Sequence, residues 1–164
     1  MKRPNLVIFI FAIVVWLSGC ASVPMAPQAE DKARKAFGPP SQGMAGLYIF
    51  RDSSFGGALL KSIYIDGKFL GESGPNVYFY TELKPGQHIL STESEFSENH
   101  LKLTMQDDQN YFVRQYIKFG VFVGGADFEV VSPEKGMVAV KKCELALPGK
   151  SQSDTQPDHI EIPQ

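Results

Sequence analysis

The sequence is poor in the residues that form covalent and metal cross-links. Only two cysteines, Cys20 and Cys143, occur in 164 residues, so at most one intrachain disulfide can form. The three histidines, His88, His100 and His159, are not spaced like zinc ligands relative to one another or to Cys143. We therefore predict no metal site, no cofactor and a fold held together by its apolar core.

The sequence also lacks strongly basic segments and recognisable catalytic motifs. The whole chain has 16 basic and 18 acidic side chains, and this slightly acidic balance argues against nucleic acid as a partner. The loop-like segment Ser53–Gly57 has neither the lysine of a phosphate-binding loop nor the pattern of a nucleophile elbow. Catalysis needs a base or nucleophile with an orienting partner. We predict no catalytic residues and a protein that is not an enzyme.

The one long apolar run lies at the N-terminus. Leu6–Trp16 follows the basic segment Met1–Arg3, which is the pattern of a secretory signal. Eleven helical residues rise only about 16 Å, against roughly 30 Å of bilayer hydrocarbon, so an uncleaved transmembrane anchor is the less favoured alternative. The run ends in Leu17-Ser18-Gly19-Cys20, which resembles the lipobox of bacterial lipoprotein precursors.

This resemblance implies that residues 1–19 are a lipoprotein signal peptide and that Cys20 becomes the first residue of the mature protein. The cysteine would carry a diacylglyceryl thioether and an N-acyl group, and several acyl chains anchor a protein stably in a membrane. Ala21-Ser22 includes no Asp of the kind that keeps Gram-negative lipoproteins in the inner membrane. For a Gram-negative host, the resemblance thus implies the periplasmic face of the cell outer membrane.

The mature chain divides into a tether, a domain and a tail. Residues 20–43 carry the lipidated cysteine and a tether, in which 29–37 has the composition of a short helix. This tether either holds the domain clear of the lipid headgroups or docks on it through Phe37. Residues 44–147 form the domain, and the polar, aperiodic residues 148–164 are a predicted disordered tail. Cys143 remains as one thiol, either buried or paired between chains.

The domain has the pattern of short strands separated by turns. Leu47–Phe50 is apolar on both faces, which predicts a central strand. Asp66-Gly67 predicts a hairpin, and Lys84–Gly86 predicts a second turn. Ser132–Glu134 has the pattern of a helix start, and this helix is predicted to reach about Glu144. We predict a mainly β fold: a small antiparallel β-sandwich with a short N-terminal helix in the tether and one C-terminal helix.

Several of these turns and strands match a known family. The matching segments are Ala33–Phe37, Pro39-Pro40, Leu47–Arg51, Tyr64–Lys68, Leu70-Gly71 and Lys84–His88. Over roughly residues 32–147, the chain resembles an uncharacterised family of bacterial lipoproteins whose domain of unknown function is related to PEGA-type β-sandwiches. The resemblance implies a small extracytoplasmic β domain, and it supplies no catalytic residue.

Two apolar features are candidates for binding. One is a possible aromatic strip on a sheet face, which would stack on sugar rings or line a partner's groove; ordinary core packing is the alternative. The strip consists of Tyr78, Tyr80, Tyr111, Phe112 and Tyr116. The other feature is the glycine-rich segment 119–125, which forms either an exposed apolar patch or a buried edge strand.

These features together predict a non-enzymatic, lipid-anchored cell-envelope protein that presents a β-sandwich interaction domain in the periplasm. Its expected partners are the membrane, through Cys20, and another envelope protein. The alternative is a glycan- or peptidoglycan-binding module that uses the aromatic strip.

Overall fold

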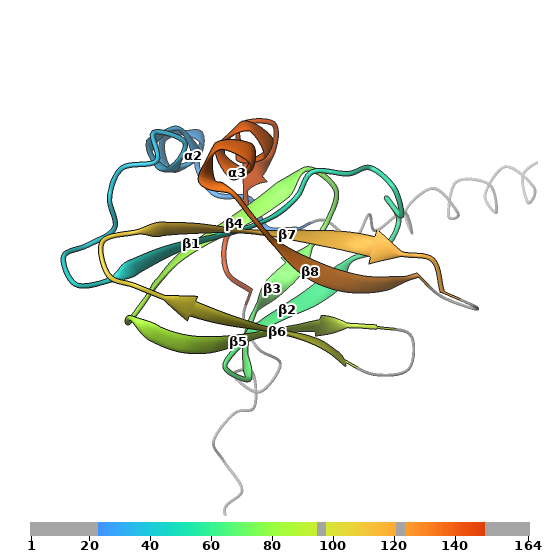
Figure 1. The fold of residues 1–164 in the computed structure, drawn as a ribbon. Coiled ribbons are helices and arrows are strands. Elements are labelled where there is room, and N and C mark those ends of the chain that lie inside the picture. The colour runs from blue at the N-terminus through green and yellow to red at the C-terminus, as the bar shows by residue number, and fades with distance from the viewer. Residues whose placement is uncertain (1–22, 95–97, 121–123, 150–164) are drawn as a thin grey trace, which may run out of the picture.

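A computed structural model describes residues 23–94, 98–120 and 124–149 (Figure 1). The predicted signal peptide, Cys20 and residues 150–164 of the predicted tail lie outside this part of the chain. Within it, no helix is both long enough and apolar enough to cross a membrane.

The described strands form two sheets that pack face to face, with two helices on one of them (Figure 1). One sheet has the strand order β8-β7-β1-β4-β9 and the other has the order β3-β2-β5-β6. The strands are β1 (Ala45–Arg51), β2 (Lys61–Ile65), β3 (Lys68–Ser73), β4 (Val77–Leu83), β5 (Gly86–Glu93), β6 (Glu98–Met105), β7 (Asn110–Lys118), β8 (Gly125–Val131) and β9 (Glu144–Leu145). This arrangement confirms the predicted mainly β sandwich.

Strand β1 is buried along its whole length, as its two apolar faces predict. It pairs antiparallel with β4, where Ala45 lies opposite Leu83, and parallel with β7, where Gly46 lies opposite Asn110. A second parallel pair joins β4 to β9. The five-stranded sheet is therefore mixed, because the chain passes through the four-stranded sheet before β7 returns beside β1.

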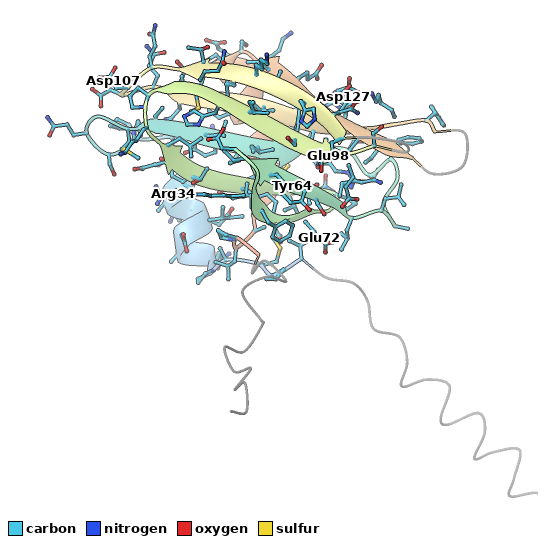
Figure 2. All side chains as sticks on the ribbon, turned by 90° about the horizontal axis from the view of Figure 1, so that it is seen from below. Arg34, Tyr64, Glu72, Glu98, Asp107 and Asp127 are labelled. Atoms are coloured by element: carbon cyan, nitrogen blue, oxygen red, sulfur yellow. The ribbon has the colours of Figure 1, made fainter. Side chains whose placement is uncertain are left out.

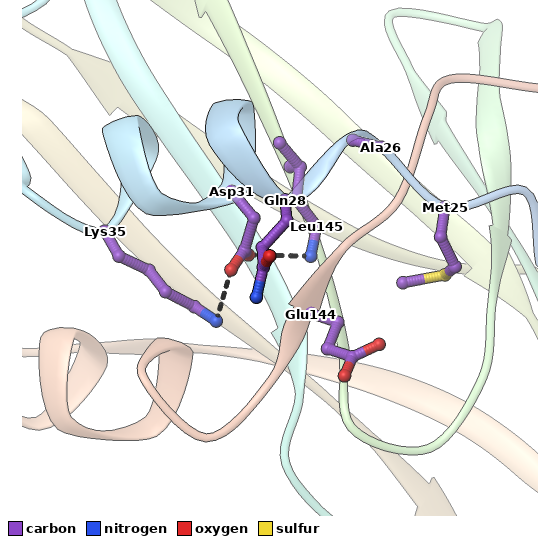
Figure 3. A pocket seen from close by; sticks show the side chains of 7 residues that line it. All are labelled: Met25, Ala26, Gln28, Asp31, Lys35, Glu144 and Leu145. Carbon is purple, nitrogen blue, oxygen red and sulfur yellow. Dashed lines mark hydrogen bonds and ion pairs between the residues drawn. The ribbon is translucent and has the colours of Figure 1, made fainter.

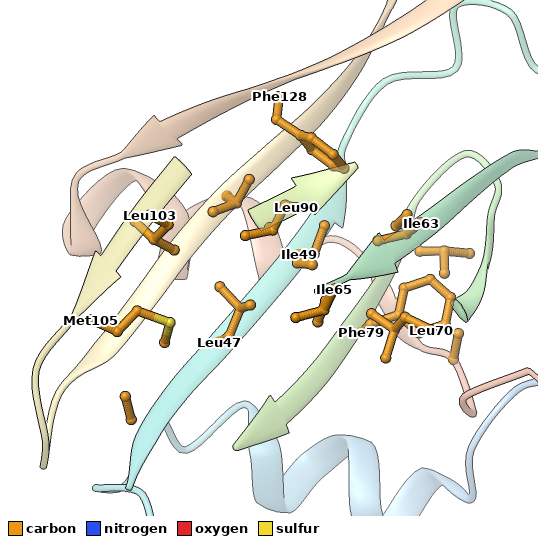
Figure 4. Packing of buried hydrophobic residues seen from close by; sticks show 14 residues of the cluster. Leu47, Ile49, Ile63, Ile65, Leu70, Phe79, Leu90, Leu103, Met105 and Phe128 are labelled. Carbon is orange, nitrogen blue, oxygen red and sulfur yellow. The ribbon is translucent and has the colours of Figure 1, made fainter. Parts of the chain in front are cut away.

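The main core lies between the two sheets (Figure 4). Successive side chains of a strand point to opposite faces, so Ala45, Leu47 and Ile49 of β1 all point toward the other sheet. Fully burying a Leu or Ile side chain contributes roughly 1.5–3 kcal/mol to stability. The buried members of this core are Ala45, Leu47, Ile49, Ile63, Ile65, Leu70, Val77, Phe79, Leu90, Leu103, Met105, Val113, Phe128 and Ala146.

Both predicted turns are present. Asp66 (φ 50°) and Gly67 (φ 74°) join β2 to β3, and two successive positive φ angles are the mark of a tight hairpin turn. The turn at 84–86 joins β4 to β5 but is not a hairpin, since these strands belong to different sheets.

Helices α2 (Gln28–Arg34) and α3 (Pro133–Val140) cover the outer face of the five-stranded sheet (Figure 1). Helix α3 begins where predicted but ends four residues earlier than predicted, because Glu144 and Leu145 pair with β4 as strand β9. Beneath the helices lies a second core of Tyr48, Phe50, Tyr78, Phe112, Ala139, Val140, Cys143 and Leu145. Cys143 is thus a free, buried thiol, which is the first of its two predicted states.

The N-terminal segment from residue 23 to residue 43 lies on the domain rather than apart from it. The Phe37 ring is 5.5 Å from the ring of Tyr48 and 5.9 Å from that of Phe112. The Tyr48 hydroxyl donates a hydrogen bond to the Arg34 carbonyl at 2.9 Å. The tether is therefore docked on the domain through Phe37, and does not hold the domain at a distance. It covers the aromatic rings on the outer face of β1 and β7.

Candidate functional site

The first described residues are held against the last strand. Val23, three residues after Cys20, packs on the main core. Met25 forms an isolated antiparallel bridge with Ala146, and the Ala26 amide donates a hydrogen bond to a carbonyl of β9 at 2.9 Å. The free length between the predicted lipidation site and the folded domain is therefore very short.

Asp31 of α2 locks this segment in place. Its carboxylate accepts hydrogen bonds from the Lys35 ammonium at 2.7 Å and from the Leu145 amide at 3.0 Å (Figure 3). A hollow of about 400 Å³ lies beside it, lined by Met25, Ala26, Gln28, Asp31, Lys35, Glu144 and Leu145 (Figure 3). Both carboxylate oxygens of Asp31 already have partners within the protein. We therefore interpret Asp31 as a structural clamp that holds α2 against β9, and not as part of a ligand site.

Several loops gather at one end of the sandwich, which we call the loop end: residues 52–60, 74–76, 119–120 and 124. Arg51 lies opposite Val77, so the loop after β1 and the turn before β4 lie at the same end. Strand β7 runs parallel to β1, so the described residues between β7 and β8, 119–120 and 124, lie there as well (Figure 1). A Cβ placed on Gly74 would lie 3.5 Å from Val23 Cγ2. The chain thus enters the domain beside the loop end.

Arg51, the last residue of β1, organises the loop end. Its side chain is completely buried. The guanidinium donates hydrogen bonds to three carbonyls of the following loop: Leu59 at 2.7 Å, Gly56 at 2.7 Å and Phe55 at 3.0 Å. Burial lowers the pKa of Arg51, but an arginine stays charged at neutral pH. One buried cation therefore fixes the path of residues 55–59.

This loop presents an exposed aromatic pair, Phe55 and Phe119, which we call the aromatic tip. Phe119 is 89% exposed and Phe55 is 47% exposed. Their ring centroids are 4.9 Å apart, and a shallow hollow of about 220 Å³ beside them is also lined by Leu59 and Ile117. Phe119 begins the glycine-rich segment 119–125, and at this residue the segment is exposed, which is the first of its two predicted alternatives. Residues 121–123 of that segment lie outside the described chain.

The five residues of the predicted aromatic strip are not brought together on one exposed surface. Tyr78 and Phe112 are buried in the second core beneath α2 and α3. Tyr111 packs against the main core, on the other side of the sheet from Phe112, because neighbouring residues of a strand point to opposite faces. Tyr80 and Tyr116 are half-buried on the outer face. For Tyr78 and Phe112, the structure has the alternative of ordinary core packing.

Tyr80 is also occupied by contacts within the protein. Its hydroxyl donates a hydrogen bond to Glu82 at 2.8 Å, and the Arg34 guanidinium lies 4.2 Å from its ring centroid. Burial raises the pKa of Tyr80, and the bond to Glu82 raises it further. This tyrosine is a neutral phenol that helps to hold α2 on the sheet.

A chain of buried polar side chains crosses the main core. The Ser73 hydroxyl donates to the Gln115 side-chain oxygen, and the Gln115 amide donates to the Thr92 hydroxyl at 2.7 Å. Thr92 in turn donates to the Ser62 carbonyl at 2.9 Å. Gln115 belongs to the five-stranded sheet and the others to the four-stranded sheet. The chain links the two sheets and contains no group that titrates near neutral pH.

His88 joins two turns at the opposite end of the sandwich. Its Nδ1 lies 2.7 Å from an Asp66 carboxylate oxygen, and its Nε2 lies 2.8 Å from the Lys84 carbonyl oxygen. Burial lowers the pKa of His88, but these two acceptors outweigh burial and raise the pKa overall. In the described ranges, no group of three His, Cys, Asp or Glu side chains is placed to hold a metal ion.

Sequence comparisons identify relatives of the chain without indicating an activity. A family model described as "Protein of unknown function (DUF2846)" matches residues 41–126, from just before β1 to the start of β8. An uncharacterised protein of Haemophilus influenzae is 51% identical over 138 residues, which are 84% of this chain and 82% of that protein. No solved structure matches. The family match includes the whole loop end.

Proposed function

The chain belongs to the DUF2846 family, and we propose that it is a non-enzymatic, lipid-anchored cell-envelope protein that presents its β-sandwich in the periplasm. One observation carries the proposal: the lipobox-like run Leu17–Cys20 ends three residues before Val23, which is part of the folded domain. If the signal is cleaved before Cys20, this cysteine lies directly before the folded domain, where acyl chains bound to it would attach the domain to a membrane.

We place the protein on the periplasmic face of the outer membrane of a Gram-negative host. The residues after the cysteine, Ala21 and Ser22, support this, since neither is the Asp that retains lipoproteins in the inner membrane. The two-sheet fold also agrees with the proposed relation to PEGA-type β-sandwiches.

An interaction role suits the described surface better than catalysis or glycan binding. The polar groups of the clamp at Asp31 and of the buried chain at Gln115 have partners inside the protein. Glycan binding by the predicted aromatic strip would need its rings to be exposed together, and two of the five, Tyr78 and Phe112, are buried. Among the described residues, the largest exposed apolar side chains are Phe55 and Phe119, which lie together as the aromatic tip.

Metabolic labelling with radioactive palmitate tests the lipid anchor. Wild-type protein and Cys143→Ala protein should incorporate label and fractionate with membranes, whereas Cys20→Ala protein should do neither. Cys143→Ala is the matched control because it removes the other cysteine. Labelling of the Cys20→Ala protein would show that the anchor has been assigned to the wrong residue.

Crosslinking in living cells tests the interaction role. The anchored protein should give a specific crosslinked envelope protein, and this product should disappear in Cys20→Ala cells. Failure to trap any partner across growth conditions, with the anchored protein present at normal abundance, would contradict the interaction role.

A further inference from the structure

We propose that the loop end lies against the lipid headgroups and that the aromatic tip, Phe55 and Phe119, inserts into the membrane interface. This inference rests on the proposed lipid anchor at Cys20, which it deepens by assigning the face of the sandwich that meets the bilayer.

The first step is the length of chain between the anchor and the fold. Two residues lie between Cys20 and Val23, which makes three residue steps, and a fully extended chain spans at most about 3.6 Å per step, so their Cα atoms lie within about 11 Å. Val23 cannot swing away from the domain, because it packs on the main core and is followed by the bridge between Met25 and Ala146. The anchor therefore holds the adjacent surface of the domain close to the bilayer.

The second step is that this adjacent surface is the loop end. Val23 lies beside Gly74, in the turn between β3 and β4. A Cβ placed on Gly57 would lie 3.7 Å from Pro75 Cγ, so the loop after β1 packs beside this same turn. Three strand spacings of about 4.8 Å separate β9 from β7, or about 14 Å in all. Phe119, which follows β7, and Gly74, which Val23 contacts, are thus at the same end of the sandwich.

The third step is the chemistry of the tip. Two phenyl rings with no polar atoms project into solvent at a place where residues 55–59 are fixed by Arg51. Beneath the tip, the Arg51 guanidinium is buried, and two ion pairs lie on the neighbouring strands: Asp52 with Arg114 at 2.7 Å, and Lys118 with Asp127, labelled in Figure 2, at 2.9 Å. An exposed apolar tip flanked by paired charges suits the boundary between headgroups and acyl chains. The short tether makes a lipid surface the expected occupant.

A single tryptophan placed at the tip tests this orientation. The mature chain has no tryptophan, since Trp16, the only one, lies within residues 1–19. We would compare Phe119→Trp with Ile89→Trp, a matched change at an exposed apolar residue beside the Asp66 turn at the opposite end. Each full-length lipidated protein, purified from membranes, is reconstituted into phosphatidylethanolamine–phosphatidylglycerol vesicles with and without bromine on the acyl chains.

The proposal predicts a blue-shifted emission for Phe119→Trp that brominated lipid quenches, and an emission from Ile89→Trp that it does not quench. Quenching at neither position, or equally at both, would overturn it. A blue shift at Phe119→Trp without quenching would also overturn it, in favour of a second copy of this chain covering the tip, because the vesicles contain no other protein. Phe55→Trp repeats the test should Phe119→Trp not fold.

Failure of the anchor itself would be seen separately, as a purified protein whose mass includes no acyl chains. Such a result would refute the proposed function before any fluorescence is measured. A protein that carries its acyl chains but shows no quenching at the tip would refute the orientation alone.

Discussion

Gly136 provides a test of how α3 is seated on the sheet. Local propensity favours replacing this helical glycine, because Ala is better than Gly in a helix interior by about 1 kcal/mol. The structure predicts the opposite result. A Cβ at residue 136 would lie 2.3 Å from Cγ, 2.4 Å from Cβ and 2.5 Å from Cδ1 of Phe112, whereas carbon atoms pack at about 3.5–4.0 Å.

The size of the effect follows from how little room Phe112 has to move. Its ring stacks on Tyr48 at 4.9 Å and meets Phe37 at 5.9 Å, and it is almost fully buried. Overpacking a buried site costs about 1–3 kcal/mol, and a methyl group placed more than 1 Å too close belongs at the upper end. After the gain in helix propensity is subtracted, Gly136→Ala should lower the free energy of unfolding by about 2 kcal/mol.

Urea unfolding of the chain beginning at Ala21, followed by circular dichroism, measures this difference. The control is Gly38→Ala, where a Cβ would meet no atom within 4 Å and the backbone does not need a positive φ. That control should be as stable as wild type or more stable, by up to about 1 kcal/mol. If Gly136→Ala were equally stable, α3 would not lie against Phe112 as described.

Three further predictions concern the ends of the sandwich and the buried thiol. The raised pKa of His88 means that its stabilising effect is complete below about pH 6.5, the unfolded value, and is lost as pH rises through the folded value. His88→Gln should therefore cost more stability in urea titrations at pH 5.5 than at pH 8.5, and equal costs would refute this. Arg51→Met should lower the free energy of unfolding by about 2 kcal/mol and speed amide exchange in residues 55–59; unchanged exchange would show that Arg51 does not fix the loop. Burial raises the pKa of Cys143 to about 12, so its thiol should react with iodoacetamide only after unfolding, and rapid labelling of the native protein would contradict its burial.

Local sequence patterns predicted the parts of the fold that depend on neighbouring residues. The apolar run in β1 gave a strand buried on both faces, and Asp66-Gly67 gave a hairpin, because the required backbone angles and burial follow from those residues themselves. The parallel pairing of Gly46 with Asn110 could not be predicted in this way, because it joins strands that are more than 60 residues apart.

The candidate site was harder to predict, for two different reasons. Arg51 depends on long-range packing, since only the folded loop brings three carbonyls around its guanidinium. The prediction that the five aromatic residues share one sheet face was wrong, and the sequence alone shows why. Tyr111 and Phe112 are adjacent in a strand, so their side chains must point to opposite faces. The sequence does not determine whether Phe37 docks, because a short segment with helical composition has no local signal for what it packs against.

The intact mass of the protein purified from membranes tests the central claim most directly. The account predicts a chain that has lost residues 1–19, begins at Cys20 and carries the added mass of a diacylglyceryl group and an N-linked acyl chain. A chain that retains residues 1–19, or a mature chain whose Cys20 thiol can still be alkylated after unfolding, would contradict it.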